Sequence, residues 1–115
     1  MNFENLEVWK HSKTLSCDLY KELKNLRDYG FKDQITRSGL SVPSNIAEGM
    51  TRGSEKEKLR FLSIAKASCA ELRTQIYIGI DINYIDKVTG EKWPGLTRLI
   101  SAMIEGSMKR VQTNP

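Results

Sequence analysis

The sequence predicts an all-α fold, an antiparallel up-and-down four-helix bundle that forms one domain over residues 1–115. Along four stretches, apolar residues recur at spacings of three and four, which is the pattern of helices that bury one face. Proline occurs only three times and no strand-like alternation persists, so we expect no β-sheet. With 115 residues and 39% hydrophobic side chains, the chain can bury one core but is too short for two.

The first helix is predicted from about Leu6 to Leu26. Its apolar stripe repeats at helical spacing and consists of Val8, Ser12, Leu15, Leu19, Leu23 and Leu26. The opposite face carries four lysines, which are Lys10, Lys13, Lys21 and Lys24. Gly30 tolerates the left-handed conformation, so we expect the helix to stop just before it.

The second helix is predicted from about Phe31 to Gly49, with Ile35 and Ile46 on its core side. Pro43 lies inside this helix, where it removes one backbone hydrogen bond and pushes its ring toward the carbonyl of the residue four positions earlier. That residue is Gly39, whose missing side chain leaves room for adjustment. We therefore expect a kink at Pro43 and not a break.

The third helix has the clearest start, because Ser54 and Glu57 have the spacing of a capping box, and it should end near Asn83. The fourth helix follows a turn at residues 88–90 and carries an apolar stripe over residues 96–111. Pro94 fits there only within the first turn. Short connections favour antiparallel packing of all four helices. A looser three-helix array with a detached C-terminal helix is the alternative.

Composition excludes several classes of function. The N-terminal residues alternate apolar with charged side chains and lack the apolar core of a secretory signal. The longest nearly apolar run, residues 76–82, is far below the roughly 20 residues that cross a bilayer, so we expect a cytoplasmic protein with no membrane partner. One histidine and two cysteines without a CxxC motif favour neither a metal site nor a redox site. We therefore predict no metal and no cofactor.

A polar stripe lies beside the apolar stripe of the second helix. Its members are Gln34, Arg37, Ser41, Ser44, Asn45 and Glu48. We interpret it as a buried structural hydrogen-bond network, in which Arg37 and Glu48 bind neighbouring helices or an adjacent subunit. A ligand pocket is the second interpretation. Catalysis is the weakest, because no nucleophile, metal ligand or histidine accompanies Glu48, and no catalytic residue is predicted.

Basic side chains form the second candidate site, for RNA or DNA. The set consists of Lys10, Lys13, Lys21 and Lys24 in the first helix, and Arg52, Lys56, Arg60, Lys66 and Arg73 at or along the third. Residues 52–73 hold six basic against three acidic side chains, in a chain with a formal net charge of +4. Such charges bind phosphate backbones without a fixed motif. The alternative is a solvated mixed-charge surface, because acidic residues lie between the basic ones.

Aromatic residues flank the predicted helices. They are Trp9, Tyr20, Tyr29, Tyr77 and Tyr84. Aromatics at the flank of a helix more often serve packing or interfaces than base stacking, so we interpret them as packing or interface anchors.

Three segments of the chain share a specific pattern with known proteins. They are Leu6-Glu7-Val8-Trp9, the run from Arg37 to Gly49 that contains S-V-P-S-N-I-A-E-G, and Arg52 with the run from Arg60 to Ala65. These segments resemble the bacterial four-helix bundle family encoded in intervening sequences of 23S ribosomal RNA genes, and the likeness spans roughly residues 6–86. The resemblance implies an up-and-down bundle that assembles as a homo-oligomeric ring, often a pentamer. A distant relative, the accessory protein of diversity-generating retroelements, binds nucleic acid through a basic surface.

These observations together predict a non-enzymatic, oligomeric binding or scaffold protein whose partners are copies of itself and RNA or DNA. The alternative is a purely structural or protein-binding oligomer with no nucleic-acid role. A third hypothesis is an enzyme or small-ligand carrier that uses Arg37 and Glu48.

Overall fold

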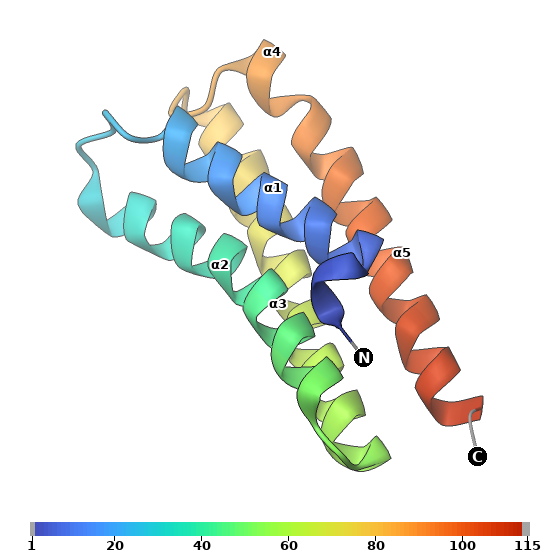
Figure 1. Ribbon diagram of the computed structural model, residues 1–115. Coiled ribbons are helices and arrows are strands. Elements are labelled where there is room, and N and C mark those ends of the chain that lie inside the picture. The colour runs from blue at the N-terminus through green and yellow to red at the C-terminus, as the bar shows by residue number, and fades with distance from the viewer. Residues whose placement is uncertain (1, 114–115) are drawn as a thin grey trace.

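Four long helices lie alongside one another in the computed structural model, which describes residues 2–113 (Figure 1). A 3-10 turn, η1 (Phe3–Asn5), precedes α1 (Glu7–Glu22), α2 (Tyr29–Thr51) and α3 (Glu55–Asp81). The one-turn α4 (Lys87–Gly90) then leads into α5 (Lys92–Thr113). Successive long helices run in alternating directions, and residues 2–113 contain no strand. The prediction of an all-α four-helix bundle is confirmed.

The order of the helices around the bundle decides which surfaces can meet. Helix α2 packs against α1 and α3, and α5 packs against α3 and α1. Figure 1 shows α1 in front of α3, so these two helices occupy opposite corners of the bundle. Their outward faces therefore point in different directions.

The buried side chains come from all four long helices. The fully buried ones of largest volume include Leu19, Ile35, Ile46, Leu62, Leu72, Ile76, Ile100 and Ile104. Their spacing of three and four along each helix is the pattern from which the helices were predicted. No helix within residues 2–113 is long and apolar enough to cross a membrane.

Two predicted boundaries shift at the connection between α1 and α2. Helix α1 ends at Glu22, four residues before the predicted end, and the chain continues in a turn in which the Leu26 N–H donates to the Leu23 carbonyl (3.0 Å). Helix α2 begins at Tyr29 because the Asp28 side chain caps it, accepting a hydrogen bond from the Phe31 N–H (3.1 Å). Gly30 therefore lies in the first turn of α2, and the prediction that it stops the first helix is wrong.

Helix α2 runs through Pro43, as predicted, and the kink there stays a prediction. The role expected for Gly39 is different in the structure. A Cβ at Gly39 would lie 2.6 Å from Cδ1 of Leu19, which is fully buried. The missing side chain therefore makes room for α1.

The last two helices begin close to their predicted positions. Ser54 caps α3, with its Oγ accepting from the Glu57 N–H (3.1 Å). Residues 88–90, predicted as a turn, belong to the short helix α4, because the Asp86 carboxylate caps it through the Thr89 N–H (3.0 Å). Pro94 is buried in the first turn of α5, where its missing N–H leaves no hydrogen bond unmade.

One exposed hydrogen bond joins the two connections at this end of the bundle. The Tyr84 hydroxyl donates to Asp28 Oδ2 (2.8 Å), and the Tyr84 ring packs edge-on against Phe31 (5.3 Å between centroids). Hydrogen bonds from the Phe31 N–H and from Tyr84 lower the pKa of Asp28. The same bond to Asp28 raises the pKa of Tyr84. Both shifts favour the state in which a protonated phenol faces a carboxylate.

We expect Gly79→Ala to destabilise the fold. A Cβ at Gly79 would lie 2.5 Å from Cδ1 of Ile85 and 3.1 Å from Cζ of Phe31. Overpacking of this kind costs about 1–3 kcal/mol. The control is Gly95→Ala, where the new methyl group meets nothing within 4 Å. Urea unfolding should show a loss of stability for the first variant and none for the second, and equal stabilities would contradict the packing.

The Asp28–Tyr84 bond should make stability fall at both ends of the pH range. Because the pKa of Asp28 is below its unfolded value of 3.8, its contribution is present above pH 3.8 and is lost as the carboxylate protonates. Because the pKa of Tyr84 is above its unfolded value of 10.0, its contribution is present below pH 10.0 and is lost as the phenol ionises.

The measurement is the difference in Tm between wild type and Tyr84→Phe as a function of pH. It should be largest between about pH 5 and pH 9 and shrink on either side. A difference that is constant across the whole range would show that the bond does not form.

Candidate binding surfaces

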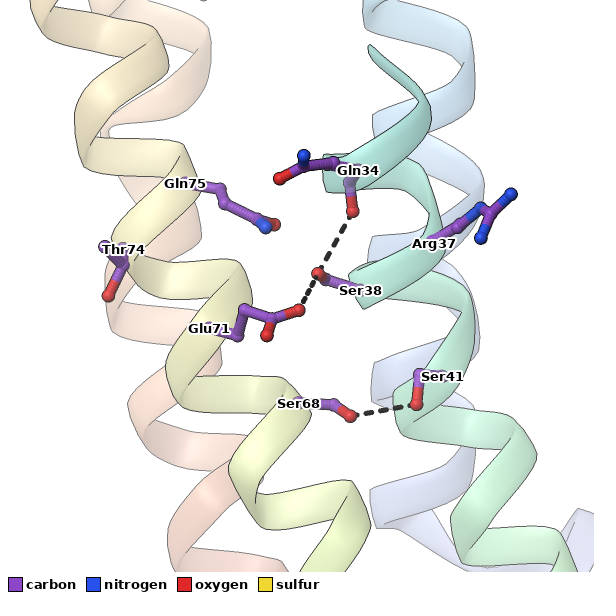
Figure 2. Close-up of a pocket in the computed structure, with 8 residues that line it drawn as sticks. All are labelled: Gln34, Arg37, Ser38, Ser41, Ser68, Glu71, Thr74 and Gln75. Carbon is purple, nitrogen blue, oxygen red and sulfur yellow. Dashed lines mark hydrogen bonds between the residues drawn. The ribbon is translucent and has the colours of Figure 1, made fainter. Parts of the chain in front are cut away.

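A polar groove runs between α2 and α3 (Figure 2). It is open to solvent, has a volume of about 570 Å³, and is lined by Gln34, Arg37, Ser38, Ser41, Ser68, Glu71, Thr74 and Gln75. Two cross-helix hydrogen bonds form its base. Ser38 Oγ donates to Glu71 Oε1 (2.7 Å), and the hydroxyls of Ser41 and Ser68 lie 2.8 Å apart.

The predicted polar network forms only in part. Asn45 Nδ2 donates to both the carbonyl O and the Oγ of Ser41 (2.8 and 2.9 Å), which continues the serine contacts along α2. Gln34 lines the groove but is exposed. The α2 residue that bridges to a carboxylate is Ser38, which the prediction omitted.

Arg37 and Glu48 are not buried within the bundle, and that part of the prediction is wrong. The side chain of Arg37 is 76% exposed and pairs with Asp33 (3.1 Å). The side chain of Glu48 is 52% exposed and pairs with Arg52 (3.2 Å). Figure 2 shows Arg37 directed away from α3. Burial of these two residues at a subunit boundary stays a prediction.

The rotation of α2 explains this outcome. Three residues at spacings of three and four face α3, namely Ser38, Ser41 and Asn45. The side that is rotated from them around the helix axis faces solvent and carries Arg37, Ser44 and Glu48. Half of the groove comes from α3, from Ser68, Glu71, Thr74 and Gln75. Ser68, Glu71 and Gln75 are spaced by three and four and form a polar helical stripe. This stripe in the sequence could have predicted the α3 side of the groove.

The groove offers acceptors for hydrogen bonds. Glu71 supplies a carboxylate, and Oε1 of Gln75 is buried without a hydrogen-bond partner within the described residues. No histidine, cysteine or lysine is among the described residues that line the groove. The hydroxyl that meets a carboxylate there is that of Ser38, through its bond to Glu71.

A row of lysines lies along the outward face of α1 and continues into the turn that follows it. This lysine ridge consists of Lys10, Lys13, Lys21 and Lys24, and all four side chains are exposed. Lys10 forms an exposed ion pair with Glu7 (3.7 Å), and the Lys13 ammonium lies 5.2 Å from the centroid of the Trp9 ring. Lys13, Lys21 and Lys24 form no ion pair within residues 2–113. By helical spacing, the acidic residues of α1 fall on its flank and not among the lysines.

The basic residues at and along α3 do not form one arc. Lys56 and Arg60 are exposed near its start, but Lys66 bonds Glu105 of α5 (2.6 Å) and lowers the pKa of that carboxyl. Arg73 is half-buried and its Nε donates to Thr97 Oγ1 (2.9 Å). The nine predicted residues therefore do not form one surface. Helices α1 and α3 lie at opposite corners of the bundle, and Lys66 and Arg73 of α3 hydrogen-bond to α5.

Arg52 and Arg60 also have intramolecular contacts, since both guanidinium groups lie near the Phe61 ring. The Arg52 guanidinium lies 4.8 Å from the centroid of the Phe61 ring, in addition to its ion pair with Glu48. The Cys69 thiol lies beside Arg73 and donates to the Thr97 carbonyl (3.1 Å), and burial raises its pKa. A raised pKa disfavours the reactive thiolate. Arg73 and Cys69 therefore belong to the packing between α3 and α5.

The aromatic residues divide into two groups. Trp9 packs edge-on against Phe3 (5.3 Å) and Tyr84 against Phe31, as expected for packing anchors, while the Tyr77 hydroxyl accepts from Arg98 (2.6 Å). Tyr20 and Tyr29, in contrast, are exposed on α1 and α2 and line one open hollow. Sequence spacing could not bring these two together, because they belong to different helices.

Comparisons with known proteins agree with this fold. A protein of unknown function from the S23 ribosomal protein family of Bacteroides thetaiotaomicron has a similar structure, with a TM-score of 0.82 and 24% sequence identity. The match covers 89% of this chain and 98% of that one, and at this identity it shows the fold alone. No curated protein sequence matches the chain.

The family itself is shown by the sequence. The profile of the 23S rRNA-intervening sequence protein family matches residues 4–106. Neither this description nor that of the structural neighbour names an enzymatic activity. The chain therefore belongs to the 23S rRNA-intervening sequence protein family.

Proposed function

We propose that the chain is a non-enzymatic binding module that contacts the phosphates of RNA or DNA through the lysine ridge of α1. The observation that carries this proposal is the ridge itself, where three lysines are exposed on one face of α1 and a fourth in the turn after it. Three of these four form no ion pair within residues 2–113. Cations without carboxylate partners are free to displace the counterions of a phosphate backbone, which favours binding.

The length of the ridge suits a nucleic-acid strand. Lys10 and Lys21 are eleven residues apart within α1. A helical rise of 1.5 Å per residue gives about 16 Å between them. Phosphates of one DNA strand repeat every ~3.4 Å along the axis, so this part of the ridge runs beside about five of them. Contacts of this kind are tolerant of sequence and sensitive to salt.

The basic residues of α3 support the proposal less well. Lys66 and Arg73 hydrogen-bond to α5, and Arg52 pairs with Glu48, so each would give up an existing contact to bind phosphate. Lys56 and Arg60 are exposed but lie at the opposite corner of the bundle from α1. We therefore assign the phosphate contacts to the lysine ridge and none of them to the basic residues of α3.

Charge reversal on the ridge tests this function. In gel shifts at low salt, the Lys13→Glu, Lys21→Glu double variant should bind RNA and DNA at least about tenfold more weakly than wild type. The matched control, Lys56→Glu with Lys87→Glu, changes the net charge equally at exposed sites on α3 and α4 and should retain most of the binding. Equal losses in both variants, or no shift with wild type, would refute the proposal.

We further propose that the module associates with copies of itself, and that the outward face of α3 takes part. Ile64 and Ile78 are exposed on α3, and the exposed Ile82 follows its last residue. Ile64 and Ile78 are fourteen residues apart and lie on the same side of the helix. Exposed apolar side chains along one side of a helix favour an interaction surface. The ring-shaped pentamer implied by the family resemblance is one assembly that would cover this face.

Light scattering tests the association. Wild type should have the mass of an oligomer, and Ile64→Glu with Ile78→Glu should shift it toward the mass of a single chain, because a buried carboxylate without a partner opposes association. Val88→Glu is the control, since Val88 is an exposed apolar residue on α4. A monomeric wild type, or an unchanged mass in the double variant, would contradict the proposal.

A further inference from the structure

Two exposed tyrosines face one hollow where α1 and α2 meet. Tyr20 comes from α1 and is 48% exposed, and Tyr29 is the first residue of α2 and is 69% exposed. Both line a hollow of about 610 Å³, together with Gly30, Lys32, Asp33 and Thr36. The hollow is open to solvent, so a ligand can reach it from outside.

Neither tyrosine hydroxyl forms a hydrogen bond within residues 2–113, unlike those of Tyr77 and Tyr84. The Tyr29 ring has a cation–π contact with the Lys32 ammonium, and a base that stacks on this ring would lie beside that charge. A single exposed aromatic residue is common on protein surfaces and indicates no site. Here two rings from different helices line one open hollow, where a flat partner can reach both.

The hollow lies at the C-terminal end of the lysine ridge. Tyr20 is next to Lys21 in the sequence, and Lys24 follows α1 by two residues. Lys32 extends the positive charge to α2, because its Nζ donates to the Lys24 carbonyl (3.2 Å) and lies 5.3 Å from the centroid of the Tyr29 ring. The carboxylate of the hollow, Asp33, is already paired with Arg37 (3.1 Å), which reduces its repulsion of phosphates.

We propose that single-stranded nucleic acid is the ligand, with unpaired bases stacked on Tyr20 and Tyr29 while its phosphates follow the lysine ridge; this inference rests on the proposed function. Aromatic rings beside a cationic track are the arrangement by which proteins bind single strands without reading sequence. In a duplex the bases are already stacked on one another and their faces are covered. The tyrosines therefore add affinity for a single strand and none for a duplex.

Fluorescence anisotropy with a labelled 15-nucleotide oligomer, alone and annealed to its complement, tests the inference. Wild type should prefer the single strand. Tyr20→Leu and Tyr29→Leu should each weaken single-strand binding by at least about fivefold. Tyr20→Phe and Tyr29→Phe should retain it, because phenylalanine keeps the stacking face. The control is Tyr77→Leu on α3, an exposed tyrosine at another corner of the bundle, which should bind as wild type does.

The salt dependence separates stacking from charge. The leucine variants should keep the wild-type slope of log affinity against log salt, because the phosphate contacts remain. Lys13→Glu with Lys21→Glu should reduce that slope by about 1.4, which corresponds to two lost contacts to a single strand. Circular dichroism melts should show that all variants fold, since the tyrosines replaced are exposed.

The outcomes distinguish the two proposals. If the leucine variants bind as wild type does and only the lysine variant fails, the ridge binds phosphates and the stacking inference is wrong. A preference for the duplex would also overturn the inference. If wild type binds neither oligomer, both proposals are wrong. Polyglutamate is the competitor for an acidic protein partner, and if it displaces the oligomer at equal charge concentration, the site recognises charge alone and the inference fails.

Discussion

The close approach of α2 to both of its neighbours is the constraint on which the rest of the structure depends. Two glycines make it possible. At Gly39 the space of a Cβ is occupied by Leu19 of α1, and at Gly49 a Cβ would lie 3.2 Å from the Lys58 carbonyl and 3.3 Å from Cβ of Phe61 in α3. A Cβ at Gly39 would displace the end of the buried Leu19 side chain, and a Cβ at Gly49 would press on the backbone of α3. Because interiors are densely packed, such a shift would spread along the bundle.

This packing also distributes the polar side chains. With α2 held between α1 and α3, its serines meet Ser68 and Glu71 across the groove, while Arg37 and Glu48 extend into solvent. The side of α1 away from the core is left to lysines. The groove and the ridge therefore belong to different pairs of helices, and they differ in charge, since the groove presents a carboxylate and the ridge presents ammonium groups.

The end of the bundle near Tyr29 is held by contacts that are distant in sequence. Asp28 both caps α2 and accepts a hydrogen bond from Tyr84, which ties the α1–α2 connection to the segment after α3. Tyr29 follows Asp28 directly, so the cap also fixes the backbone of a residue that lines the hollow with Tyr20. Because these hydrogen bonds of Asp28 fix the connection, an aromatic residue there loses less conformational entropy on binding than one on a free loop.

The sequence by itself determined the four helices, because helix formation is specified by local periodicity and local caps. The stripe of α1, the Ser54 cap of α3 and the passage of α2 through Pro43 could all be predicted, and the errors were confined to boundaries such as Asp28 and Gly30. Only the tertiary structure decided which side chains share a surface. Ser38 is adjacent to Arg37 in the sequence, yet a turn of about 100° places one against α3 and the other in solvent. Tyr20 and Tyr29 line one hollow, and the basic residues of α1 and α3 lie apart, because the order and rotation of packed helices depend on contacts between residues far apart in the chain.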